Sequence, residues 1–114
     1  MAVDRRKNGM KIESLLDFVA KLEEMRKACD AEDMVRDSCG TYPKNEILSD
    51  LIKDARYLIQ YGEYRIALEN LLDNLAEYEI TLDDQTLDLA VCAFGNNIAR
   101  RDKEALAALQ KDDT

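Results

Sequence analysis

Apolar residues recur every three or four positions along most of the chain, the spacing that places side chains on one face of an α-helix. The first stripe predicts a helix that begins near Lys11, with an apolar face made of Leu15, Phe18, Leu22, Met25 and Cys29. The stripe loses its phase at Glu32 and Asp33. Two interpretations stay open there: one long helix that drifts to about Ser38, or a short second helix capped by Asp30.

A break is predicted over 40–43, where a glycine and the single proline stand close together. After Pro43, a broad apolar arc predicts a second helix over 44–60, and the width of the arc indicates neighbours on two sides. Gly62 is predicted to end this helix in a left-handed conformation. The apolar arc consists of Ile47, Leu48, Leu51, Ile52, Ala55, Leu58 and Ile59.

A third helix is predicted from Glu63 or Tyr64 to Glu79, and its link to the second helix is so short that the two should pack antiparallel as an αα-hairpin. Asp83 is a good N-cap for a fourth helix. This helix either ends at Gly95, the alternative we favour, or continues with Ile98 in phase. A last helical stretch covers 102–110. We therefore predict an all-α fold, a small bundle of four to five helices around a central antiparallel αα-hairpin.

The length of the chain places these helices in one domain, residues 11–114, behind a flexible N-terminal tail, residues 1–10. No apolar run is long enough to cross a bilayer, and the basic residues near the start are not followed by the apolar stretch of a signal peptide. We therefore expect a cytoplasmic protein. The three cysteines are expected to be free thiols, two of them semi-buried: Cys29, Cys39 and Cys92.

Histidine is absent from the chain. This absence removes the commonest general base and the commonest metal ligand. No pair of carboxylates stands out from the other acids as a catalytic pair. We therefore expect no enzymatic activity, no catalytic residue, no cofactor and no bound metal.

The net charge of −8 is unevenly distributed along the chain. Residues 62–94 hold eight acids and one base, a net charge of −7, whereas residues 1–61 hold 12 acids and 11 bases. Residues 95–114 hold four of each sign. The acidic segment 62–94 repels nucleic acid and anionic membranes, and it attracts a basic protein.

An acidic stripe on the predicted third helix is the sharpest single feature. Glu69, Asp73 and Glu77 follow one another at four-residue steps, opposite the leucines of the same helix. Like charges at this spacing cost about 0.2–0.5 kcal/mol per pair, and only Arg65 is placed to offset one of them. The stripe is either a solvated face or a docking surface for a basic partner.

Four tyrosines are expected around the turn between the second and third helices: Tyr57, Tyr61, Tyr64 and Tyr78. Tyrosine suits an interface because it buries a large area and keeps a polar tip, and it equally suits the edge of a small core. Ile66 projects toward the acidic side of its helix, and we expect another helix to cover it.

A dense motif lies in the same region. It reads Tyr61-Gly62-Glu63-Tyr64, then Ala67-Leu68-Glu69-Asn70-Leu71, then Leu75, Glu77, Tyr78, Ile80 and Leu82. The motif resembles the G-E-Y-x-x-A-L-E-x-L … L-x-E-x-x-I-x-L signature of the MafI-type immunity proteins of contact-dependent inhibition and other polymorphic toxin systems. The chain departs from that signature with Thr81 where proline is expected and Arg65 where glycine is common.

The resemblance implies a cytosolic immunity protein that binds the toxic C-terminal domain of a cognate effector. Several relatives accompany ribonuclease toxins, including EndoU-like ones, and an acidic helical face could cover the basic RNA-binding or active site of such a domain. The protein itself would bind neither nucleic acid nor membrane. The candidate partner-binding residues are Glu63, Tyr64, Glu69, Asp73, Glu77, Tyr78, Glu79 and Asp84.

A second class of function fits the same composition, namely a small acidic helical adaptor or secretion chaperone. The neighbouring gene separates the two classes, because an immunity protein needs a toxin gene immediately upstream and an adaptor does not.

Overall fold

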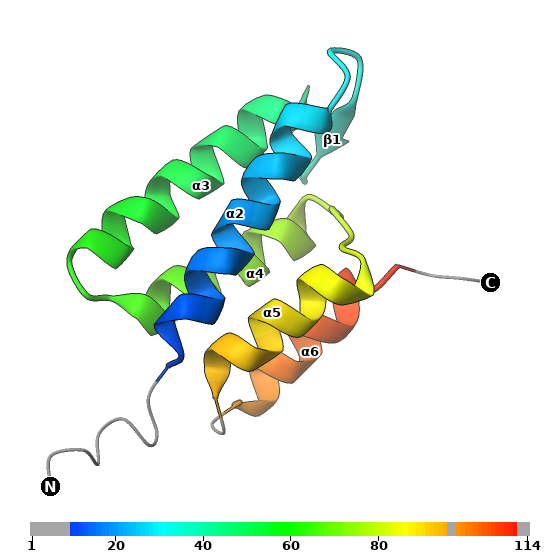
Figure 1. Ribbon diagram of the computed structural model, residues 1–114. Helices are drawn as coiled ribbons and strands as arrows, with labels where there is room; N and C mark the ends of the chain where they lie inside the picture. Colours follow the sequence, from blue (N-terminus) through cyan, green and yellow to red (C-terminus); the bar gives the residue numbers. More distant parts are fainter. Residues whose placement is uncertain (1–9, 96–97, 112–114) are drawn as a thin grey trace, which may run out of the picture.

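The computed structural model describes residues 10–95 and 98–111 (Figure 1). Within these residues five helices and one two-stranded antiparallel sheet follow in the order α2 (Ile12–Ala28), β1 (Met34–Arg36), β2 (Thr41–Pro43), α3 (Lys44–Gln60), α4 (Tyr64–Glu77), α5 (Asp84–Phe94) and α6 (Arg100–Leu109). The predicted helical class is confirmed. The prediction of an all-α fold without strands is wrong, because a β-hairpin lies between α2 and α3.

The β-hairpin replaces both helical interpretations of residues 30–38. Its turn is held by Asp37, whose carboxylate accepts hydrogen bonds from the backbone N–H groups of Cys39 and Gly40, at 2.8 and 3.1 Å. Val35 lies opposite Tyr42 in the ladder, and both residue types favour extended backbone. The hairpin joins α3 directly, at the end of the molecule where α2 ends and α3 begins (Figure 1).

The helices pack in a series of neighbouring pairs. α2 contacts α3 and α5, α3 contacts α4, and α4 contacts α6 on its other side (Figure 1). This arrangement confirms the predicted pairing of the second and third helices and the two-sided contacts of α3. Their shared core contains the predicted stripes: Leu15, Phe18 and Leu22 from α2, Leu48, Leu51, Ile52 and Ala55 from α3, and Leu68, Leu71, Leu72 and Leu75 from α4.

Gly62 ends α3 as the sequence predicts. Its φ of 79° is left-handed, and its N–H donates to the carbonyl of Ile59 at 3.0 Å. The N–H of Glu63 donates to the carbonyl of Leu58 at 2.9 Å. These two bonds form a Schellman motif, which satisfies the last carbonyls of the helix and lets α4 begin at once.

The end of α4 has the same geometry without a glycine. The N–H of Glu79 donates to the carbonyl of Ala76 and the N–H of Ile80 to the carbonyl of Leu75, at 3.0 and 2.9 Å. Glu79 takes the left-handed position with a φ of 57°, which costs a side-chain-bearing residue roughly 1–2 kcal/mol. α4 therefore ends at Glu77, two residues before the predicted end.

The C-terminal third is held by local helix ends and by two long-range main-chain hydrogen bonds. Asp83 caps α5 as predicted, and its carboxylate accepts a bond from the N–H of Thr86 at 2.8 Å. Gly95, with a φ of 69°, ends α5. The N–H of Leu82 donates to the carbonyl of Leu109 at 2.8 Å, and the N–H of Lys11 donates to the carbonyl of Ala93 at 2.9 Å.

The predicted tail, residues 1–10, lies outside the described residues except for Met10, which packs against the core. The final helix begins at Arg100 rather than at Asp102. Of the three free cysteines only Cys29 is partly buried, whereas Cys39 and Cys92 are exposed, so the expectation of two semi-buried thiols is wrong.

Candidate functional site

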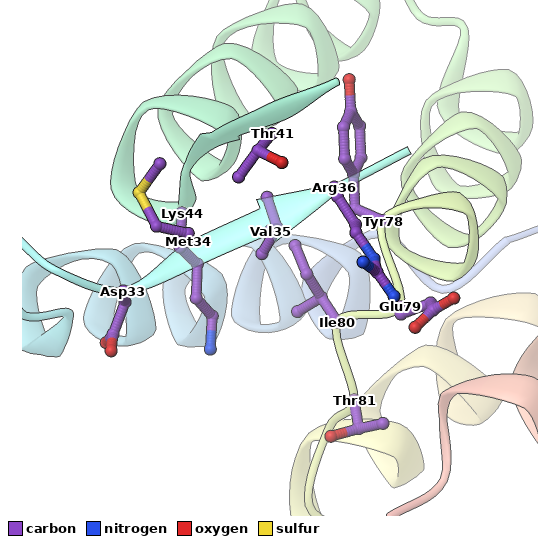
Figure 2. Close-up of a pocket in the computed structure, with 10 residues that line it drawn as sticks. All are labelled: Asp33, Met34, Val35, Arg36, Thr41, Lys44, Tyr78, Glu79, Ile80 and Thr81. Atoms are coloured by element: carbon purple, nitrogen blue, oxygen red, sulfur yellow. The ribbon is translucent and has the colours of Figure 1, made fainter. Parts of the chain in front are cut away.

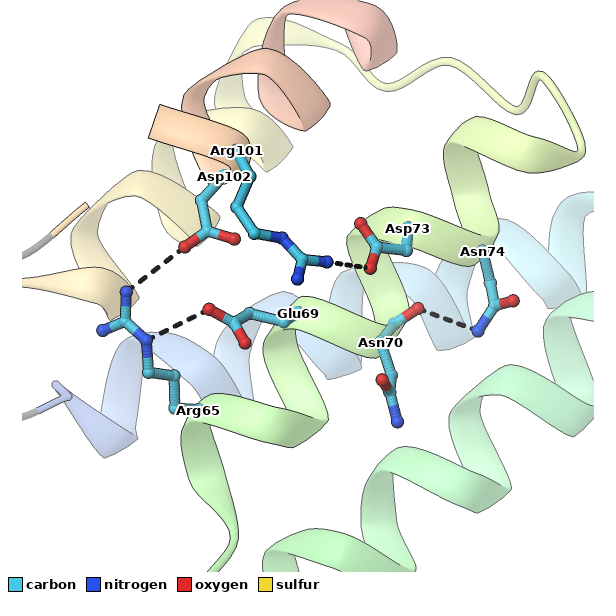
Figure 3. Close-up of polar contacts among 7 residues, drawn as sticks. All are labelled: Arg65, Glu69, Asn70, Asp73, Asn74, Arg101 and Asp102. Atoms are coloured by element: carbon cyan, nitrogen blue, oxygen red, sulfur yellow. Dashed lines mark hydrogen bonds and ion pairs between the residues drawn. The ribbon is translucent and has the colours of Figure 1, made fainter. Parts of the chain in front are cut away.

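The acidic stripe on α4 is not an unpaired, solvated face. α6 packs along it and brings two residues of its own to the stripe, Arg101 and Asp102 (Figure 3). Arg101 pairs with Asp73, with 2.6 Å between Nη2 and Oδ2. Arg65 pairs with Glu69 at 3.1 Å. Arg65 therefore offsets one acid of the stripe as predicted. Asp73 has a partner that the sequence analysis did not expect, because Arg101 lies on a helix distant in the sequence.

Arg65 lies at the centre of this polar interface. Its Nη2 is 3.2 Å from an oxygen of Asp102, whose side chain is only 2 % exposed. The guanidinium also lies over the ring of Phe94, 5.2 Å from the ring centre. Arg65 therefore joins α4 to α5 and α6.

Two carboxylates share this one arginine. Burial raises the pKa of Glu69 above its ordinary value of 4.5, and the neighbouring carboxylate of Asp102 raises it further. The bond from Arg65 opposes this effect, but the net direction is upward. Glu69 thus holds a proton more firmly in the folded chain than in the unfolded chain.

We expect Glu69→Gln to flatten the pH dependence of stability. A raised folded-state pKa means that the contribution of Glu69 is fully present below pH 4.5 and is lost as the pH rises through the folded value. Glutamine cannot titrate and keeps an oxygen for Arg65. The melting temperature at pH 7 should therefore not fall, and its decline above pH 4.5 should become shallower.

Thermal unfolding from pH 4 to pH 8 measures this effect. Glu104→Gln, on the exposed side of α6, removes the same charge without burial and should keep the wild-type profile. A steeper decline in the Glu69 variant would contradict the assignment.

The eight candidate partner-binding residues do not lie on one surface. Glu63 is exposed and Tyr64 half-buried at the start of α4, whereas Glu77, Tyr78 and Glu79 lie at its end. A helix of this length separates its two ends by about 20 Å. Asp84 is exposed in the first turn of α5. With Glu69 and Asp73 engaged by arginines, the exposed candidate acids at the end of α4 and the start of α5 are Glu77, Glu79 and Asp84.

The tyrosines divide into two groups instead of one cluster. Tyr57 and Tyr61 are exposed at the end of α3, with ring centres 5.0 Å apart. Tyr78 lies at the opposite end of α4, where it meets Tyr42 of β2 edge to face at 6.0 Å. Ile66 is 47 % exposed, so the expectation that another helix covers it is wrong.

Tyr42 and Tyr78 mark the junction between the hairpin and the end of α4. Burial raises the pKa of each hydroxyl, and the negative charge of Asp37 raises it further. Both hydroxyls therefore stay protonated at neutral pH and remain hydrogen-bond donors. The sequence analysis missed this junction, because Tyr42 and Asp37 were assigned to a break and to the end of a helix.

A groove of about 490 Å³ opens beside this junction (Figure 2). Residues 33–36 of the hairpin form one wall and residues 78–81 form the other. Met34 and Val35 supply exposed apolar surface, whereas Ile80 is only 2 % exposed. The lining holds two acids, Asp33 and Glu79, and two bases, Arg36 and Lys44. Two of the candidate residues, Tyr78 and Glu79, thus border a concave surface that their spacing did not reveal.

Nowhere in residues 10–95 and 98–111 do three Cys, Asp or Glu side chains gather in a way that could hold a metal ion. None of the described helices combines the length and the apolar character needed to span a membrane. Comparisons with protein families, with curated proteins and with solved structures find no match to this chain.

Proposed function

We propose that this chain is an immunity protein that binds the C-terminal domain of a cognate bacterial toxin in the cytosol and covers its basic RNA-binding or active site. The observation that carries the proposal is the charge at the hairpin end of the molecule. The segments 30–44 and 77–84 contain the residues that line the groove, and together they hold eight acids and two bases, a net charge of −6. Most of these acids lie outside the lining itself, which holds two acids and two bases. A ribonuclease domain presents the opposite charge, because it must bind phosphate.

The motif that resembles the MafI-type family belongs mainly to the scaffold. Gly62 makes the turn between α3 and α4, and most of the apolar residues of the motif are buried: Ala67, Leu68, Leu71, Leu75, Ile80 and Leu82. The resemblance therefore supports a common fold, and the choice of toxin falls to exposed residues around it. Among the candidate acids, Glu79 lines the groove, and Glu77 and Asp84 are the exposed ones nearest in the chain to its residues 78–81.

Charge complementarity raises the association rate of such a complex more than its affinity. Fast capture suits an immunity protein, because a few free nuclease molecules harm the cell. Tyr78, half-buried beside the groove, is the type of side chain that supplies affinity once water is excluded.

The test is a charge reversal of the exposed acids, Glu77→Lys, Glu79→Lys and Asp84→Lys in one variant. Binding is measured against the C-terminal domain encoded by the neighbouring upstream gene. We expect association to slow by at least tenfold at low salt, the range in which electrostatic steering acts, and protection of cells from the toxin to be lost. Circular dichroism should show an unchanged fold.

The matched control reverses three exposed acids elsewhere, Glu13, Asp54 and Glu104, and produces an equal change in net charge. This variant should bind and protect nearly as well as the wild type. Equal loss in both variants would mean that only net charge matters. Failure of the wild-type chain to bind the toxin domain would overturn the proposal.

A further inference from the structure

Among the residues that the structure describes, one edge of β1 is not paired with another strand. The N–H of Lys44 donates to the carbonyl of Asp33 at 2.8 Å, and Val35 lies opposite Tyr42. Bonded and non-bonded pairs alternate along an antiparallel ladder. The main-chain groups of Met34 and Arg36 therefore point away from β2, and within the described residues no other main-chain group bonds to them.

The opposite wall of the groove also carries unpaired main chain. Leu82 forms a parallel bridge with Gln110, and its N–H donates to Leu109. The preceding residue, Thr81, is exposed, and its main-chain groups make no backbone hydrogen bond among the described residues. Two segments with free donors and acceptors thus border the same groove (Figure 2).

The other edge of the hairpin is closed to strand pairing. Pro43 of β2 has no N–H to donate, and proline is a common means of blocking an edge strand. The edge of β1 is therefore the side of the hairpin on which another strand can add.

We propose that a partner inserts an extended basic segment into this groove, where its main chain pairs with Met34 and Arg36 as an added strand. Strand addition of this kind draws affinity from main-chain bonds and specificity from alternate side chains. One set of alternating side chains would contact Val35, which is partly exposed in the groove. The other set would face the surroundings of the groove: the segments 30–44 and 77–84 have a net charge of −6, although the lining residues themselves hold two acids and two bases.

The identity of the partner, a basic nuclease domain, rests on the proposed function, whereas the pairing itself rests on the hairpin geometry. Amide hydrogen exchange measured by NMR on the full chain tests the pairing with two separate probes. One probe is the upstream-encoded toxin domain, and the other is an acetylated and amidated peptide of alternating lysine and valine. Exchange should slow at Met34 and Arg36, and it should change little at Val35, which is already bonded to β2.

Proline variants test the same bonds by affinity. Arg36→Pro removes the outward N–H, and it should bind the toxin domain roughly tenfold more weakly than Arg36→Ala, which loses the same side chain and keeps the N–H. Thr41→Pro makes the same backbone change on β2, at a residue whose N–H faces away from β1. Its affinity should stay within about twofold of the wild type if surface changes away from the contact have their usual small effect.

Each outcome decides between the two proposals. If the toxin domain slows amide exchange at Met34 and Arg36, whether or not the peptide does so, both the added strand and the toxin partner are supported. If only the peptide slows exchange there, the strand site is supported and the toxin is overturned as partner. A third result is that the toxin domain binds without slowing amide exchange at Met34 and Arg36 and with equal affinity for the two Arg36 variants. That result overturns strand addition and leaves the proposed function intact. Binding of neither probe overturns both.

Discussion

Replacing Arg65 with methionine is expected to lower the free energy of unfolding by about 3 kcal/mol. Methionine keeps much of the length of the side chain but cannot neutralise Asp102, whose side chain is only 2 % exposed. Removing one partner of a buried ion pair typically costs about 3–5 kcal/mol. The lower end applies because Arg65 itself is 37 % exposed. Urea denaturation followed by circular dichroism measures the change.

Two further variants separate the loss of the ion pair from a general effect of losing an arginine. Arg56→Met changes the same residue type at an exposed position of α3 and should alter stability by less than about 0.5 kcal/mol. Adding Asp102→Leu to Arg65→Met should restore part of the loss, because the buried charge disappears together with its partner. Equal effects of Arg65→Met and Arg56→Met would contradict the central role of Arg65.

Gly62→Val is expected to destabilise the fold by about 2 kcal/mol. A Cβ at this position would meet no atom within 4 Å, so the loss arises from backbone strain and not from a clash. Strained backbone of this kind costs about 1–3 kcal/mol, and a branched Cβ is among the worst choices for a positive φ. The melting temperature of the variant should fall by several degrees, about 4–8 °C for each kcal/mol in a domain of this size.

The opposite change at the end of α4 provides the matched comparison. Glu79 occupies the same left-handed position, with a φ of 57°, so Glu79→Gly should raise stability by about 1 kcal/mol. Gly62→Asn should cost less than Gly62→Val, since asparagine tolerates a positive φ. An unchanged melting temperature in both Gly62 variants would mean that the turn does not control the fold.

The helical part of the fold could be predicted because local chemistry determines it. Pro43 and Gly62 enclose α3, and its predicted bounds agree with the observed ones. The hairpin could not be found in the same way, because each strand has only three residues and periodicity needs a longer run. Its one local signal is the turn, in which Asp37 and Gly40 stand between residues that favour extended backbone.

The candidate site was harder to predict, because its residues meet only in three dimensions. The spacing of Glu69 and Asp73 correctly places them on one face of α4, but nothing in that spacing shows that Arg101 and Asp102 lie across from them. An arrangement of ion pairs between helices is a tertiary property. For the same reason, the groove beside Tyr78 depends on the hairpin and could not be derived without it.

The bond between Lys11 and Ala93 has a consequence for the order in which the chain folds. α3 and α4 are joined by a tight turn, so they can pair as soon as both have been synthesised. α2 and α5 meet only after almost the whole chain has been made, and each doubling of the loop to be closed adds about 0.6 kcal/mol of entropic cost. On the ribosome, the face of α2 that packs against α5 therefore stays uncovered until the last third of the chain emerges. The pairing of α2 with α5 should be the late, slow step that completes the native state.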